Sequence, residues 1–280
     1  IVINKNQTLN KPIRFLFFTS TAENIMISPR INIHCKENSS LTFLQHFVGS
    51  SNNFFINSSI SCFLDKNSSM RHKKIIGESK NGTIFNKINI QQKHNSKYDF
   101  LQFSYDANLS RTKIEAKLNG DGAECSLNGL SLSRKNQQLG THIITNHFTP
   151  NCWSHQNFKN ILLDNSSGIF NGRTIVHKNA QKTDSQQSNK NLILSENALM
   201  NSNPQLEIYA DDVKCSHGST TGALDEDALF YLRSRGLNPT EAKKLLIRGF
   251  AIELFEDLKH EPTKNFMVNK FEDWLLHIAA

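Results

Sequence analysis

The chain has 280 residues, a formal net charge of +7 and a hydrophobic fraction of 38%. That apolar content is below the average of globular domains, but 19 phenylalanines and recurrent short apolar runs argue against a disordered chain. No apolar run approaches the ~20 residues of a membrane-spanning helix, so we expect no membrane span. The lysines are scattered and are not interleaved with stacking aromatics, so the basic charge does not predict a nucleic-acid-binding protein.

Cysteine usage favours a reducing compartment. The five cysteines are widely separated and odd in number, and no two of them form a C-x-x-C pair. This spacing argues against a disulfide framework and against a self-contained zinc or iron–sulfur site. The first residues form an alternating apolar run rather than a secretory signal. We therefore expect a cytoplasmic protein, with the plastid stroma as the alternative.

The first 210 residues read as a series of short strands separated by polar turns. Most apolar runs are three to five residues long and alternate with polar residues, as half-buried strands do. Clusters of Asn, Ser, Asp and Gly separate the runs, and no helical pattern of ten residues interrupts them. In chain order, the predicted strands are 25–27, 31–33, 41–44, 60–63, 84–90, 100–105, 112–118, 123–127, 130–132, 141–144, 161–163, 168–170, 174–176, 192–194 and 206–208.

So many short strands indicate a mainly β protein built as a sandwich, a barrel or a β-solenoid. A solenoid suits the modest apolar content, because each coil buries only a thin strip of side chains. The sequence shows no repeat of fixed length, however, so strand spacing alone leaves the solenoid and the sandwich as equal alternatives.

The pattern changes to helices after Gly222. Asp225–Asp227 form an acidic first turn of a helix that ends at Gly236. Asn238–Glu241 then supply a cap, a first-turn proline and a capping acid for a second helix, which Pro262 is expected to end before a third. The sequence therefore predicts a β domain over residues 1–222 and a helical domain over residues 223–280.

The densest polar group lies at residues 211–218. If this segment is a strand, Cys215 and His217 project to the same side, because they are two residues apart. A thiolate and an imidazole suit iron or zinc, but two ligands do not complete a site. Alternatively, Cys215 follows Val213 into the core and His217 serves a turn.

Other polar groups carry weaker signals. We interpret Asp184–Asn189 as a solvated corner and Cys152–His155 as a packed turn around Trp153. The sequence contains no phosphate-binding glycine loop, no G-x-S-x-G elbow and no H-E-x-x-H motif. We therefore expect no enzyme activity from this chain by itself.

Residues 203–218 and 224–236 resemble a family signature. Together with the upstream residues 170–172, 182–186 and 191–195, these residues are similar to the SufB/SufD family of iron–sulfur cluster assembly scaffolds, and within it to the SufD branch. The resemblance is close over residues 140–258. Because the N-terminal helical region of the family is not recognisable here, we expect the chain to be either a fragment or a reduced version of a family member.

The resemblance implies a right-handed parallel β-helix followed by a helical region. It also implies a non-catalytic scaffold that pairs with a SufB-type paralogue near the end of the β-helix. The helical region, residues 225–258, would dock a SufC-type ABC ATPase, which binds ATP in place of this chain. The implied docking residues are Asp225, Phe230, Tyr231, Arg233, Arg235, Leu246 and Phe250.

The resemblance assigns a role to two residues of the polar segment. His217 would be an iron ligand and Cys215 would lie beside it, so that a transient iron–sulfur cluster or iron is shared with the SufB-type partner. A homodimer is the alternative state of the isolated chain.

Two other functions stay open. The chain could be the SufB-like, cluster-bearing paralogue, although the Cys215–His217 segment departs from the acidic segment of such chains. It could also be a β-helix carbohydrate-active enzyme, which would need paired carboxylates at a cleft. Asp211 and Asp212 are adjacent, so in a strand they would point to opposite faces.

Overall fold

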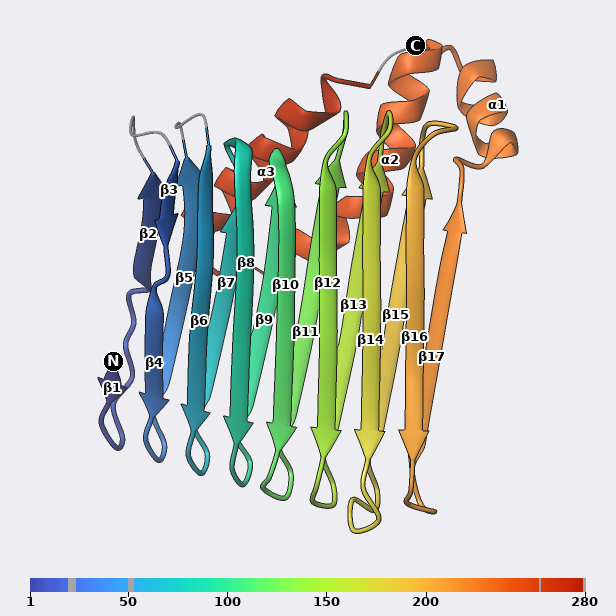
Figure 1. Ribbon diagram of the computed structural model, residues 1–280. Helices are drawn as coiled ribbons and strands as arrows, with labels where there is room; N and C mark the ends of the chain where they lie inside the picture. Colours follow the sequence, from blue (N-terminus) through green and yellow to red (C-terminus); the bar gives the residue numbers. More distant parts are fainter. Residues whose placement is uncertain (20–23, 50–52, 257, 279–280) are drawn as a thin grey trace.

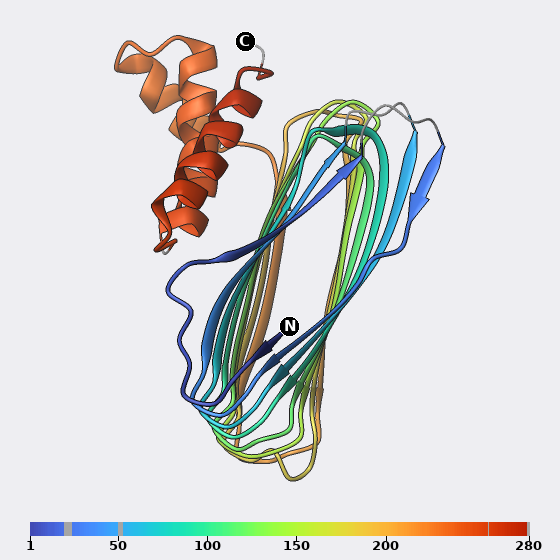
Figure 2. The same ribbon diagram turned by 90° about the vertical axis from the view of Figure 1, so that its left-hand side faces the viewer.

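The computed structural model describes residues 1–19, 24–49, 53–256 and 258–278. The chain forms a flattened β-solenoid made of two parallel sheets, followed by three helices (Figures 1 and 2). All strand pairs among the described residues are parallel, which confirms the solenoid and rules out the antiparallel sandwich.

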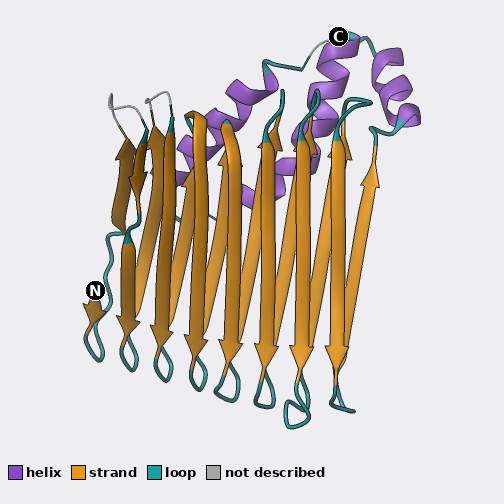
Figure 3. Cartoon of the chain, viewed as in Figure 1, coloured by secondary structure: helices purple, strands orange, loops and turns teal. Residues whose placement is uncertain are grey.

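Successive strands alternate between the two sheets, except that β3 and β4 both belong to sheet A. Sheet A contains β1 (Val2–Ile3), β3 (Ile25–Ile27), β4 (Arg30–Cys35), β6 (Phe54–Leu64), β8 (Ser79–Gln92), β10 (Ala107–Leu118), β12 (Gln138–His147), β14 (Ser167–Val176) and β16 (Leu199–Ile208). Sheet B contains β2 (Ile13–Thr19), β5 (Ser40–Gly49), β7 (Ser69–Ile76), β9 (Lys97–Tyr105), β11 (Glu124–Ser133), β13 (Trp153–Leu162), β15 (Asp184–Ile193) and β17 (Lys214–Gly222). Figure 3 shows that most strands run along the length of the body, that those nearest the N-terminus are shorter, and that loops join them.

The coils stack in register although their lengths differ. Leu109, Gln138, Ser167 and Leu199 are consecutive register partners, so neighbouring coils are offset by 29, 29 and 32 residues. This variation explains why the sequence shows no fixed repeat.

The strands are longer than the apolar runs predicted. β11 joins two predicted runs into one strand, and β8 contains 14 residues. The prediction failed because polar side chains fill part of the interior. The solvated corner predicted at residues 184–189 was wrong, since this segment belongs to β15 and buries Ser185, Gln187 and Asn189.

Hydrogen bonds hold these interior amides in place, although Gln187 Oε1 has no partner among the described residues. Gln187 Nε2 donates to Gln156 Oε1 at 2.8 Å, and Asn189 Nδ2 donates to the Phe158 carbonyl at 3.0 Å. Residues 153–155 likewise form the start of β13 rather than a turn, and Cys152 is buried directly before the strand. A buried amide that keeps its hydrogen-bond partners costs little folding free energy. Rows of polar side chains and rows of apolar side chains can therefore share one core.

Asparagines form the turns at one end of the solenoid. Asn6, Asn38, Asn67 and Asn95 have φ between 51° and 61°, which asparagine tolerates better than most residues. Asn38 Nδ2 donates to Asn6 Oδ1 at 2.9 Å, and Asn67 Nδ2 donates to Asn38 Oδ1 at 3.0 Å. This ladder ties neighbouring turns together.

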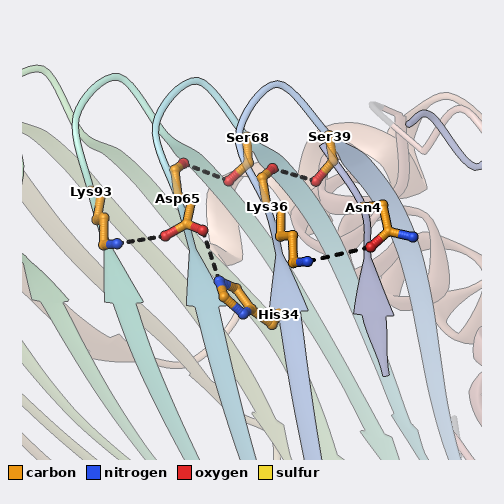
Figure 4. A network of polar contacts seen from close by, with 7 residues as sticks. All are labelled: Asn4, His34, Lys36, Ser39, Asp65, Ser68 and Lys93. Atoms are coloured by element: carbon orange, nitrogen blue, oxygen red, sulfur yellow. Dashed lines mark hydrogen bonds and ion pairs between the residues drawn. The ribbon is translucent and has the colours of Figure 1, made fainter. Parts of the chain in front are cut away.

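An ionic group lies beside that ladder. Asp65 contacts Lys93 Nζ at 2.7 Å and His34 Nε2 at 2.8 Å, and Figure 4 shows the carboxylate between the two bases. Partial burial opposes the charge on Asp65, but the hydrogen bonds from Lys93 and His34 outweigh it and lower the pKa of the carboxyl. The group joins three successive coils.

The three helices begin and end close to the predicted positions. They are α1 (Glu226–Ser234), α2 (Pro239–Glu256) and α3 (Glu261–Leu275). Asp225 Oδ1 accepts from the Ala228 amide at 2.9 Å, and Gly236 follows α1 with φ at +96°. Pro262 does not end α2, because α2 already stops at Glu256; the proline lies in the first turn of α3.

Helices α2 and α3 pack on part of the outer face of sheet B, toward one end of the solenoid (Figures 1 and 2). Ile247, Leu254 and Phe255 pack against Leu101 and Phe103 of β9 in one buried cluster. None of the helices in the described part of the chain is long and apolar enough to cross a membrane. The described residues place no helix on the outer face of sheet A (Figure 2).

Candidate functional site

The last coil leaves one end of the solenoid open. β16 and β17 are the outermost strands of their sheets at this end, so each has a free edge. Pro204 lies within β16, as an edge strand permits because its outer side has no ladder to break. Most residues of β17 are exposed to solvent, whereas β15 alternates buried and exposed residues. A free parallel edge is a template for pairing with another chain.

Two rows of inward-pointing side chains, each made of register partners on stacked strands, end at this edge. The first passes from Ser154 to Ser185 to Cys215, and all three are register partners. The second passes from Gln187 to His217. Ser185 and Gln187 are buried by the next coil, but Cys215 is half-buried and His217 is exposed because no coil follows. Both side chains therefore continue the lumen rows, on the same side of β17.

The main chain of these residues points to the free edge. Lys214 donates its amide to the Thr183 carbonyl at 2.8 Å, toward β15. Backbone groups of successive strand residues alternate sides, so the amide and carbonyl groups of Cys215, His217 and Ser219 face away from β15. Cys215, His217 and Ser219 thus direct their side chains toward the interior of the solenoid, and their main-chain amide and carbonyl groups toward the free edge.

Cys215 is a free thiol in an apolar setting. It packs with Val213 against Val176, Ala180 and Ala210, as the core alternative predicted. Burial raises the pKa of this thiol, and the charge of Asp184 adds to the increase. The thiol is therefore protonated at neutral pH, and binding of a metal would displace its proton.

Polar contacts fix the second half of β17. Ser202 of β16 lies 2.7 Å from Ser219 Oγ and donates to Asn189 Oδ1 at 2.7 Å. Asn191 Nδ2 donates to the Thr220 carbonyl and to Thr221 Oγ1, both at 3.1 Å. The Ser202 contacts join the two sheets at the open end, and the Asn191 bonds tie β17 to β15 within sheet B.

Sequence reasoning missed the residue beneath His217. Gln187 is only 3% exposed, and its Oε1 has no hydrogen-bond partner among the described residues. The alternating polar pattern of residues 184–191 was the available signal. Asp211 and Asp212 are both exposed and lie in the loop before β17 rather than in a strand.

The donor set is incomplete within the described part of the chain. No group of three or more His, Cys, Asp or Glu side chains is placed there to hold a metal ion. Cys215 and His217 are the chemical types that iron accepts, but a four-coordinate site needs further ligands. These two residues can supply only part of a shared site.

The implied docking residues divide between two surfaces. Phe230 and Tyr231 of α1 are 73% and 57% exposed, and Arg235 lies over the Tyr231 ring at 5.2 Å. Asp225 caps the same helix, and Arg233 lies exposed in its last turn. These residues form one exposed group on α1.

The two docking residues on α2 are less exposed. Leu246 is half-buried, and Phe250 packs toward sheet B, where Lys159 of β13 lies 5.0 Å from its ring centre. Phe250 therefore does not join the exposed aromatic pair of α1.

Comparison with known proteins identifies the family. Residues 17–250 match the family model described as "SUF system FeS cluster assembly, SufBD core domain". The chain belongs to the SufB/SufD family. This result confirms the resemblance that the sequence signature indicated.

Among its relatives are SufD proteins. The chain is 31% identical to the iron–sulfur cluster assembly protein SufD of Escherichia coli over 94% of its own length and 63% of the relative's. It is 32% identical to an iron–sulfur cluster assembly SufBD family protein of Synechocystis over 91% of this chain and 59% of that one. The chloroplastic protein ABCI7 of Arabidopsis thaliana is 30% identical over 82% of this chain and 49% of that protein. The chain thus spans about three-fifths of the length of the first two relatives.

Proposed function

We propose that this chain is a non-catalytic scaffold subunit of the SUF iron–sulfur cluster assembly complex. The open end of the solenoid carries this proposal, because β16 and β17 expose free edges beside the lumen residues Cys215 and His217. A SufB-type paralogue that adds its own strands to these edges would close the coil and cover both side chains.

The shared end would hold the cargo of the complex. His217 would act as a ligand to iron or to the nascent cluster, and the Cys215 thiol would lie beside it, with the remaining ligands from the partner. The incomplete donor set of this chain supports a shared site. The cluster is here the product under assembly rather than a resident cofactor.

The helices would form the docking module for a SufC-type ABC ATPase. Phe230 and Tyr231 support this assignment, because large aromatic residues that stay exposed on a short helix are typical of interface anchors. Arg233 and Arg235 flank them and add charge that a partner can pair. The ATPase would bind ATP, and this chain would transmit its movements. The division between residues 1–222 and 223–280 stays a prediction.

The docking assignment is tested by capture of the ATPase. A Phe230→Ala/Tyr231→Ala variant should capture at least tenfold less SufC-type ATPase from a co-expressing strain, because it removes the exposed anchors without touching buried residues. The control variant, Leu276→Ala, removes an equally exposed apolar residue beyond α3 and should capture normally. Equal capture by the double variant and the wild-type chain would contradict the assignment.

The ligand role of His217 is tested in the purified complex with its SufB-type and SufC-type partners. His217→Ala should leave the subunit composition intact and lower the iron and sulfide retained after anaerobic reconstitution several-fold. Ser216→Ala, at the neighbouring position on the opposite side of β17, is the control. An unchanged cluster yield in His217→Ala with an intact complex would count against the role.

A further inference from the structure

The outer face of sheet A carries a cluster of cations, across the solenoid from the helices (Figures 1 and 2). Lys87 of β8, Lys113 of β10 and His142 of β12 are register neighbours on three adjacent strands. Arg111 lies two residues before Lys113, so it projects from the same face of β10. Lys87, Arg111 and Lys113 are all exposed.

Among the described residues, one carboxylate, Glu115, lies on the same face of β10 beside these cations. Glu115 contacts Lys117 at 3.3 Å, whereas Lys87, Arg111 and Lys113 form no ion pair within the described part of the chain. Like charges on directly opposed strand positions repel each other. Partial burial lowers the pKa of His142, and the charges of Arg111 and Lys113 lower it further, which indicates the positive potential at this point.

An apolar hollow lies next to the cations. Its volume is about 300 Å³, and Phe85, Leu109 and Ile169 line it together with Arg111 and His142. Ile169 is 45% exposed, so the hollow opens to solvent. Apolar surface and unpaired positive charge therefore occur side by side.

Gly140 lines the hollow, and neither packing nor backbone conformation requires a glycine there. A Cβ at this position would lie 3.7 Å from the Ser110 carbonyl and 3.8 Å from Ile169 Cβ, which are ordinary contacts. Its φ is outside the left-handed region, and it lies inside β12. Glycine weakens a strand interior, and such a position often marks close approach by another molecule.

We propose that this face binds an acidic segment of a partner protein, with an apolar side chain seated in the hollow over Gly140 and carboxylates paired to Arg111 and Lys113. A guanidinium binds a carboxylate in bidentate fashion, and neighbouring lysines add charge. The apolar wall selects against a purely polar polyanion. The surface is separate from the open end and from the helices, so it does not depend on the proposed function.

Fluorescence anisotropy with the full chain tests the proposal. The probe is a fluorescein-labelled hexapeptide of alternating aspartate and phenylalanine. Two companion peptides replace phenylalanine by glycine or aspartate by lysine, and a thymine hexanucleotide is the nucleic-acid competitor. Arg111→Glu and Gly140→Val are the test variants, because one reverses a charge and the other fills the hollow with a residue that suits strands. Lys178→Glu, at an exposed position between β14 and β15, is the matched charge control.

The wild-type chain should bind the aspartate–phenylalanine peptide at least tenfold more tightly than either companion peptide. Arg111→Glu and Gly140→Val should each weaken that binding at least tenfold, and Lys178→Glu should not. Circular dichroism melting of each variant separates lost binding from lost folding. The proposal is overturned if no peptide binds at millimolar concentration, if Lys178→Glu weakens binding as much as Arg111→Glu, or if the hexanucleotide binds more tightly than the peptide.

Discussion

Two buried histidines, His46 and His147, connect the stability of the protein to pH. Burial lowers the pKa of each to about 4; the charge of Arg14 adds to the decrease at His46, and that of His177 adds to it at His147. His147 Nε2 lies 2.9 Å from Ser154 Oγ, and its Nδ1 has no partner among the described residues. A proton on either ring would therefore be unpaired in the interior.

The unfolded chain binds more protons than the folded chain between pH 6.5 and about 4. Stability is therefore full above pH 6.5 and falls as the pH decreases toward 4, by at most roughly 3 kcal/mol for each histidine. Urea unfolding at pH 7 and pH 5 measures this loss. His147→Gln should reduce the difference between the two pH values, and the exposed variant His94→Gln is the control. An undiminished difference in His147→Gln would show that this residue is not responsible.

Lys74 shows where single-residue reasoning fails. It lies in a basic run of the sequence, yet it is fully buried and donates to Thr112 Oγ1 at 2.6 Å and to Gln102 Oε1 at 3.2 Å. Burial lowers its pKa well below the usual value for lysine. Arg71–Lys74 break the apolar pattern on which strand prediction rests, so the sequence did not predict β7.

At the scale of elements, an ion pair helps to hold α2 on sheet B. Lys159 of β13 is only 3% exposed, pairs with Glu253 and donates to the Phe250 carbonyl at 2.6 Å. Burial lowers the pKa of this lysine, and Glu253 offsets part of that effect. Glu253 therefore favours the charged form of this lysine.

Glu253→Gln should loosen α2, because it leaves the buried ammonium without a counter-charge. We expect hydrogen exchange of the α2 amides to become at least fivefold faster, which corresponds to roughly 1 kcal/mol. The double variant Lys159→Met/Glu253→Gln removes the charge as well and should restore slow exchange. Unchanged exchange in Glu253→Gln would mean that the apolar cluster alone holds the helix.

Local signals predicted the helices better than the strands. Asp225, Asn238 and Gly236 carry cap and stop chemistry within a few residues, so helix ends could be read directly. Where a strand begins and ends depends instead on the contacts that each of its residues makes with the neighbouring coil. Gln187 and Asn189 read as surface residues because the sequence does not show the amides and carbonyls that stack over them.

The same limit applies to the candidate site. The two-residue spacing of Cys215 and His217 predicted that they share one side of a strand. Their position at the last coil could not be derived from spacing, because it depends on where stacking stops. Nor could spacing show that Phe250 faces sheet B while Phe230 faces solvent.

At the scale of the whole molecule, the solenoid offers three different surfaces. Sheet B is covered in part by α2 and α3, sheet A has an open cationic face, and the last coil ends in two free edges. The free edges combine main-chain groups that lack partners with the lumen side chains Cys215 and His217. Pairing of this end with a paralogue is therefore the central claim.

Co-purification of the SufB-type paralogue with a Ser219→Pro variant tests that claim most directly. The amide of Ser219 faces the free edge, so proline removes a donor for the partner and leaves the ladder to β15 intact. Ser219→Ala removes only the hydroxyl that contacts Ser202. The account predicts that Ser219→Pro lowers capture of the paralogue at least tenfold, whereas Ser219→Ala, with the same melting temperature, captures it normally. Full capture by a folded Ser219→Pro chain would contradict it.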